Sequence, residues 1–174
     1  MGDIELFLAH KEDNTELNEF YNNIWDGKYD KWILKYPEYI ESIFLCLWRM
    51  SSHFDKERLE LFLEKGMNIN KRLNQYEKVS TFLHVACDRQ DGEIIDLLLC
   101  HGANPVEDMV TSCIYGHAYG DAANTESILR CLNILEMHSI PLRMRKEHYD
   151  DLMKMKCFDS SKFKEFFERF EIYE

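Results

Sequence analysis

The sequence has few helix-breaking residues and no long apolar run. Only three prolines and seven glycines occur among 174 residues, and apolar residues recur mostly at i, i+3, i+4 and i+7. Helices should therefore dominate, and strands have little to build on. No segment approaches about 20 consecutive apolar residues, and residues 1–10 lack a basic start and a cleavage site. We expect a cytoplasmic protein that is neither secreted by the general route nor inserted in a membrane.

The cysteines lack the spacing of metal or redox motifs. They form no CxxC pair, and no cysteine–histidine cluster has zinc-ligand spacing. Nearly all lie in apolar runs, which predicts reduced, buried thiols that act as small hydrophobic side chains. No metal site and no cofactor are expected. The six cysteines are Cys46, Cys87, Cys100, Cys113, Cys131 and Cys157.

Basic residues are outnumbered by acidic ones. The chain has 32 acidic and 21 basic side chains, a formal net charge of −11. This charge repels nucleic acid and anionic membrane surfaces, and it attracts a basic protein. Acidity can equally serve solubility alone. The length, with 45% hydrophobic and 30% charged residues, predicts one soluble globular domain.

Motifs for catalysis are also missing. The sequence has no glycine-rich phosphate loop, no nucleophile elbow and no His-Glu-x-x-His motif, so we expect no catalytic residue. Acidic pairs such as Glu107 with Asp108, or Asp150 with Asp151, are better explained as charged turns than as acid–base pairs. Residues 116–124 are rich in small residues, which favours a loosened loop between helices and leaves a functional role as the alternative.

One segment carries a recognisable repeat. Residues 80–105 read STFLHVACDRQDGEIIDLLLCHGANP. Thr81, Leu83 and His84 match the Thr-Pro-Leu-His opening of an ankyrin repeat, Phe82 replaces the proline, and the Gly-Ala-Asn terminator begins at Gly102. The segment resembles an ankyrin repeat along its whole length. The resemblance implies paired helices that stack repeat on repeat.

The signature residues have physical roles in such a repeat. The Thr81 hydroxyl can cap the first helix, and Gly102 can supply the left-handed residue that ends the second. Ala86 and Cys87 are small and allow adjacent helices to approach closely. His84 is expected to tie neighbouring loops by hydrogen bonds, as a structural rather than a catalytic or metal-binding residue.

The same frame recurs on both sides of this segment. Gly66 lies 36 residues before Gly102, and Ser139 stands 37 residues after it, where a glycine is expected. Further back, Gly27 is matched with Gly92. Residues 1–174 should therefore form a single domain, an all-α ankyrin-repeat solenoid of about five helix-turn-helix units with degenerate capping repeats. The units are an N-terminal cap at 14–40, a repeat at 41–76, the best-defined repeat at 77–110, a degenerate repeat at 111–142, and C-terminal cap helices at 143–174.

The resemblance also implies a protein-binding surface made of hairpin tips and first-helix faces. The family's usual contact positions, carried onto this sequence, give nine candidate partner-binding residues. They are Glu77, Lys78, Ser80, Asp88, Arg89 and His101 in the best-defined repeat, and Ser52, His53 and Lys65 in the preceding one.

Three functions are compatible with these features, because a fold does not name a partner. The favoured one is a non-enzymatic inhibitor that binds and neutralises a basic toxin or nuclease domain, as immunity proteins do. The alternative is a pathogen effector or viral ankyrin protein that diverts a host signalling or ubiquitin-ligase component. A cryptic enzyme is least favoured, since no chain length is left for a catalytic domain. Direct nucleic-acid or membrane binding is not expected.

Overall fold

The structure is a computed structural model that describes residues 3–10, 14–50, 56–75, 78–107, 109–115, 125–154 and 163–174. Helices make up 69% of the structure, which confirms the expectation that helices dominate. The expectation that strands are nearly absent needs a correction, because two small two-stranded sheets are present among the described residues. The chain divides into two compact units, Met1–Ser80 (unit 1) and Thr81–Glu174 (unit 2).

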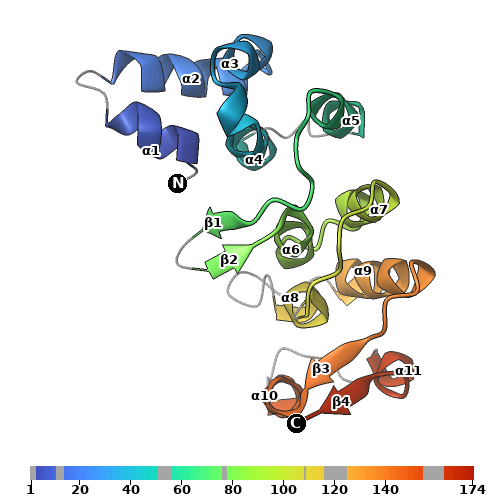
Figure 1. Cartoon of the computed structure of the whole chain (residues 1–174). Coiled ribbons are helices and arrows are strands. Elements are labelled where there is room, and N and C mark those ends of the chain that lie inside the picture. Colours follow the sequence, from blue (N-terminus) through green and yellow to red (C-terminus); the bar gives the residue numbers. More distant parts are fainter. Residues whose placement is uncertain are drawn as a thin grey trace. The chain divides into compact units, whose positions relative to one another are not determined.

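Unit 1 is built around one buried helix. Its elements are α1 (Asp3–Ala9), α2 (Thr15–Trp25), α3 (Asp30–Lys35), the 3-10 helix η1 (Pro37–Tyr39), α4 (Ile40–Met50), α5 (Lys56–Glu64), β1 (Leu73–Gln75) and β2 (Lys78–Ser80). Helices α1, α2 and α3 all contact α4 (Figure 1). Every residue of α4 from Ile40 to Trp48 is buried, so this helix forms the core of the unit. Strands β1 and β2 pair as an antiparallel hairpin.

Two buried carboxylates in unit 1 have polar partners. Glu5, only 5% exposed, accepts a hydrogen bond from the Tyr21 hydroxyl at 2.9 Å and lies 3.5 Å from the Arg49 guanidinium. Burial and the contact with Glu5 raise the pKa of Tyr21 to about 12. Glu41 accepts a hydrogen bond from the Asn68 amide at 3.0 Å. The Glu5 contacts connect α1 with α2 and α4, and the Glu41 bond connects α4 with the turn after α5. Such partners are needed because an unpaired buried charge is costly.

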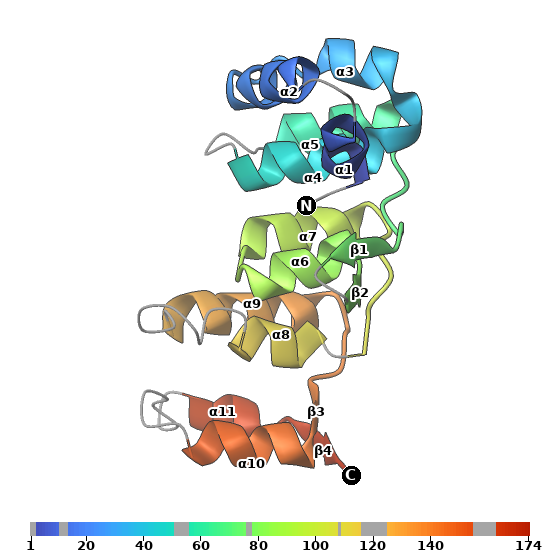
Figure 2. The same cartoon turned by 90° about the vertical axis from the view of Figure 1, so that its left-hand side faces the viewer.

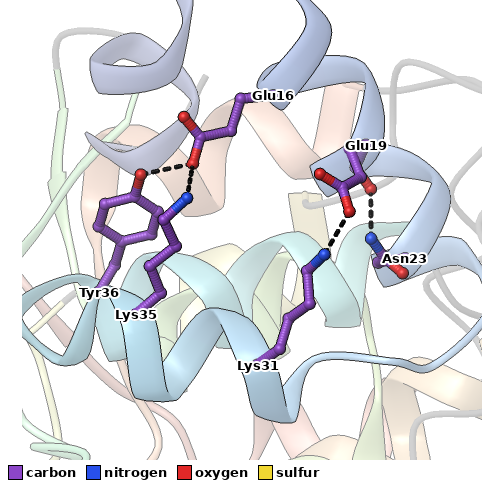
Figure 3. Close-up of polar contacts among 6 residues, drawn as sticks. All are labelled: Glu16, Glu19, Asn23, Lys31, Lys35 and Tyr36. Atoms are coloured by element: carbon purple, nitrogen blue, oxygen red, sulfur yellow. Dashed lines mark hydrogen bonds and ion pairs between the residues drawn. The ribbon is translucent and has the colours of Figure 1, made fainter.

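Polar contacts join α2 to α3 on the outer side of unit 1 (Figure 3). Glu16 accepts a hydrogen bond from the Tyr36 hydroxyl at 2.6 Å and pairs with Lys35. One turn further along α2, Glu19 pairs with Lys31. The spacing of three and four residues places each set of side chains on one helix face. Helices α2 and α3 therefore form a pair within residues 14–40.

Unit 2 consists of helix pairs in two layers. Its elements are α6 (Phe82–Asp88), α7 (Gly92–Cys100), α8 (Met109–Tyr115), α9 (Thr125–Met137), β3 (Arg143–Arg145), α10 (Lys146–Lys154), α11 (Lys164–Phe167) and β4 (Glu171–Tyr173). Helices α6, α8 and α10 form one layer, and α7, α9 and α11 form the other (Figures 1 and 2). Strand β3 pairs with β4 in parallel, so the C-terminal segment contains strands as well as the expected cap helices.

The first helix pair of unit 2 begins with two side-chain caps. The Thr81 hydroxyl accepts a hydrogen bond from the His84 amide at 3.3 Å, which confirms its predicted capping role. The Asp91 carboxylate caps α7 in the same way, accepting from the Ile94 amide at 3.2 Å. Each cap satisfies an amide at the helix start that has no partner within the helix.

Residues in the left-handed backbone conformation follow several helices in both units. At the end of α7, the Ala103 amide donates to the Leu98 carbonyl at 2.9 Å, the bond that closes a helix through a left-handed residue. The predicted role of Gly102 is thereby confirmed, and Ser139 takes the same conformation without being a glycine. The described residues with positive φ are Gly27 (72°), Gly66 (92°), Gln90 (55°), Gly102 (84°) and Ser139 (59°).

The expected match between Gly27 and Gly92 is wrong. Gly27 lies after the end of α2 with φ of 72°, whereas Gly92 is the first residue of α7. A Cβ atom at Gly92 would lie 2.9 Å from Ile134 Cδ1, so this glycine permits the close approach of α9. The residue that occupies the place of Gly27 in the first pair of unit 2 is Gln90, which follows α6.

Replacing Gly102 by valine should lower the free energy of unfolding by about 1 kcal/mol or more. A Cβ atom there meets no other atom within 4 Å, so the cost comes from the left-handed backbone and not from a clash. Ser139→Gly is the matched control, and it should raise stability by up to about 1 kcal/mol. Chemical denaturation of the three proteins checks both values. An unchanged midpoint for Gly102→Val would contradict the assigned helix end.

Candidate partner-binding surface

Part of the predicted contact set lies outside the described residues. This applies to Ser52, His53 and Glu77, and also to residues 116–124, whose role the sequence left open. Lys78 belongs to β2, but its side chain is outside the described part. The remaining candidates are Lys65, Ser80, Asp88, Arg89 and His101.

Two of the remaining candidates belong to unit 1. Lys65 follows the end of α5, and its ammonium group lies 3.6 Å from the Asp30 carboxylate. The Ser80 hydroxyl is buried and has no hydrogen-bond partner among the described residues. A buried hydroxyl is not available to a partner protein, so the Ser80 side chain does not contribute to a contact surface.

The other three candidates lie on the first helix pair of unit 2. Asp88 is the last residue of α6, Arg89 follows it, and both are exposed. His101 is exposed after the end of α7. Because α6 and α7 are antiparallel and α7 is about 13 Å long, His101 lies at the opposite end of the pair. The structure brings Asp88 and Arg89 together and separates them from His101.

A shallow hollow beside the C-terminal strands of unit 2 is mostly acidic. The Arg145 guanidinium lies 3.7 Å from the Glu107 carboxylate and 4.0 Å from that of Glu147. Asp150 is exposed and forms no ion pair with another described residue. The lining has four acidic and two basic side chains. The hollow therefore carries an excess of negative charge that attracts cationic groups. The lining residues are Glu107, Arg145, Lys146, Glu147, Asp150, Tyr173 and Glu174.

His84 has a structural role. Its Nε2 atom lies 2.8 Å from the Ser112 hydroxyl oxygen, which joins α6 to α8 in the next helix pair. The sequence predicted a bond between neighbouring loops, but the partner is on a helix. Next to it, the Gln90 side-chain amide donates to the Cys113 carbonyl at 3.0 Å. Two hydrogen bonds therefore connect the first two helix pairs of unit 2.

The cysteines follow the predicted pattern with one exception. None of the five described cysteines is in a disulfide. Hydrogen bonding to Cys113, together with burial, raises the pKa of the Cys131 thiol above its ordinary value, as expected for an unreactive core thiol. Cys100 departs from the expectation because it is exposed, and Cys157 lies outside the described residues. The buried cysteines are Cys46, Cys87, Cys113 and Cys131.

The structure also brings together Asp96, Cys100 and His138, whose ligand atoms all lie within 4.8 Å of one another. Their positions in the chain did not suggest this grouping, because His138 is 42 residues from Asp96. A usable signal was present, since Asp96 and Cys100 are four residues apart on one helix. The repeat frame also aligns His138 with His101, the residue next to Cys100, but such a recurrence is expected of repeats without any metal.

Comparison with known proteins assigns no family, because no family model matches the chain and neither curated proteins nor solved structures gave a significant match. No helix in the described ranges is long and apolar enough to cross a membrane.

His84→Ala and Ser112→Ala should each lower the free energy of unfolding by about 1 kcal/mol, because each removes one partner of a half-buried hydrogen bond. The double variant should lose less than the two single losses added together. Denaturant titration of the four proteins measures this coupling. Strictly additive losses would show that the two side chains do not interact.

Proposed function

We propose that the protein is a non-enzymatic, ankyrin-like binding module that inhibits a basic protein, with a toxin or nuclease domain as the favoured class. The observation that carries this proposal is the exposed acidic charge on unit 2. Asp88 on α6 and Asp150 on α10 are exposed, and neither forms an ion pair with a described residue. Both helices belong to the same layer (Figure 2).

The charge of unit 2 supports a basic partner. Residues 81–174 contain 17 acidic and 10 basic side chains, so this unit carries −7 of the formal −11. An acidic surface of this kind speeds the encounter with a basic protein and disfavours acidic competitors. Nucleic acid carries the same sign of charge and is repelled.

The helix pairs support the ankyrin-like part of the proposal. Gly66, Gly102 and Ser139 end successive second helices with the same left-handed conformation, at the spacing expected from the repeat. Stacked helix pairs of this type expose one helix layer along its length and suit the binding of extended protein surfaces. The exposed ends of α6 and the acidic hollow beside α10 are two places on such a layer.

Affinity capture from the native cell, followed by mass spectrometry, identifies the partner. The proposal expects a basic protein that is retained at low salt and released as salt rises, because the Debye length falls to about 8 Å at 0.15 M. Adding the purified protein in equal amount should abolish the toxic or nuclease activity of that partner. A signalling or ubiquitin-ligase component held independently of salt would favour the alternative function instead.

Reversing Asp88 and Asp150 to lysine together should slow association with the captured partner by about tenfold at low salt, since steering charges act mainly on the association rate. The variant should unfold like the parent, because both side chains are exposed. Stopped-flow or surface-based kinetics at two salt concentrations measure the effect.

The matched control reverses Glu165 and Glu168, which are exposed on α11 and directly after it in the other layer and form no ion pair with a described residue. It changes the net charge by the same amount. It should slow association much less than the Asp88 and Asp150 variant. Equal effects in both variants would mean that only net charge matters, and no effect in either would contradict recognition by charge.

A further inference from the structure

Three side chains with metal-binding atoms converge where α7 meets α9. Asp96 and Cys100 are four residues apart on α7, which places them on one face of the helix. His138 immediately follows the end of α9. The His138 Nε2 atom lies 2.7 Å from Asp96 Oδ1, and the Cys100 sulfur lies 3.9 Å from the same oxygen. All three ligand atoms come from unit 2.

The chemistry of these donors fits a zinc ion. Zinc in proteins is bound by imidazole nitrogen, thiolate sulfur and carboxylate oxygen, at metal–ligand distances of about 2.0 to 2.3 Å. In a tetrahedral site these distances place nitrogen and oxygen about 3.3 Å apart, and sulfur and oxygen about 3.5 Å apart. The Asp96–His138 distance would open by about 0.6 Å and the Cys100–Asp96 distance would close by about 0.4 Å. Side-chain rotation alone supplies movements of this size.

The cluster is open to solvent, and the two helices that carry it are in contact elsewhere as well. The side chains of His138 and Asp96 are 24% and 48% exposed, and Cys100 is exposed, so an ion can enter from solvent. Arg130 on α9 also lies 3.3 Å from Glu93 on α7. That pair is exposed and contributes little, but α7 and α9 also pack closely where Gly92 faces Ile134, so variants of the cluster should still fold.

We propose that Asp96, Cys100 and His138 bind one Zn²⁺ ion, which links α7 to α9 and keeps a fourth coordination position for water. Three protein ligands with an open fourth position are common in zinc sites that exchange a ligand. This site lies on α7 and α9, apart from Asp88 and Asp150, which are proposed to bind a partner. Its existence does not depend on that function.

Metal titration of the purified full chain, stripped with a chelator, tests the site directly. Calorimetry or competition with a chromogenic chelator should give one Zn²⁺ per chain, and native mass spectrometry should show the same stoichiometry. Substituting Co²⁺ should produce visible ligand-field bands and a thiolate-to-cobalt charge-transfer band, which a site without sulfur does not give. Affinity should fall as the solution is acidified, because protons compete with the metal for its ligands.

Single replacements identify the ligands. Cys100→Ser and His138→Gln should each weaken Zn²⁺ binding by at least about 100-fold, since even residues behind the ligands change affinity by 10- to 100-fold. His101→Gln is the matched control, because it removes an exposed histidine at the equivalent place one repeat earlier. Its affinity should match the parent. Circular dichroism and thermal unfolding without metal confirm that each variant is folded.

Alkylation of the parent protein gives a readout that needs no variant. Bound Zn²⁺ should protect Cys100 from iodoacetamide, as read by peptide mass spectrometry, and a chelator should restore its reactivity. Absence of one-to-one binding, unprotected Cys100, or full affinity in both ligand variants would each overturn the proposal. Weak binding of several ions without a cobalt–thiolate band would show nonspecific attraction to acidic side chains only.

Discussion

The structure depends on one backbone constraint, the left-handed residue that follows α2, α5, α6, α7 and α9. Antiparallel helices joined by short links can pack only if the chain turns back sharply, and a positive φ achieves this within one residue. Gly102 meets the requirement without strain. Gln90 and Ser139 meet it with a side chain present, at some conformational cost. For Gln90, the hydrogen bond to the Cys113 carbonyl offsets part of that cost and also connects two helix pairs.

Once the helices are paired, a few polar contacts set how the pairs stack in unit 2. His84 bonds Ser112 between α6 and α8, and the ion pair between Arg130 and Glu93 joins α7 to α9. The absence of a side chain at Gly92 lets α9 approach α7 closely. Apolar burial holds such layers together but is not directional, so the half-buried bond between His84 and Ser112 and the close approach at Gly92 help to fix the register of one pair against the next.

The sequence predicted those features that local chemistry determines. Thr81 and Gly102 were placed correctly because a cap hydroxyl and a left-handed glycine leave clear local signals. The left-handed conformation of Gln90, which follows α6, was missed, since a glutamine does not indicate positive φ. The parallel pairing of β3 (Arg143–Arg145) with β4 (Glu171–Tyr173) was missed because strands of three residues separated by two helices have almost no periodicity. The partner-binding surface was the least predictable feature. The contact positions that the ankyrin resemblance implies indicate which residues are accessible, but not which partner they bind.

The two proposals concern different layers of unit 2, and this separates them physically. The acidic charge assigned to partner binding lies on α6 and beside α10, whereas Asp96, Cys100 and His138 join α7 to α9 (Figures 1 and 2). One Zn²⁺ that displaces one thiol proton adds about one positive charge, against a formal −7 for the unit. The long-range field that attracts a basic protein therefore keeps its sign when the metal binds. Zinc is expected to stiffen one layer while the other remains available for recognition.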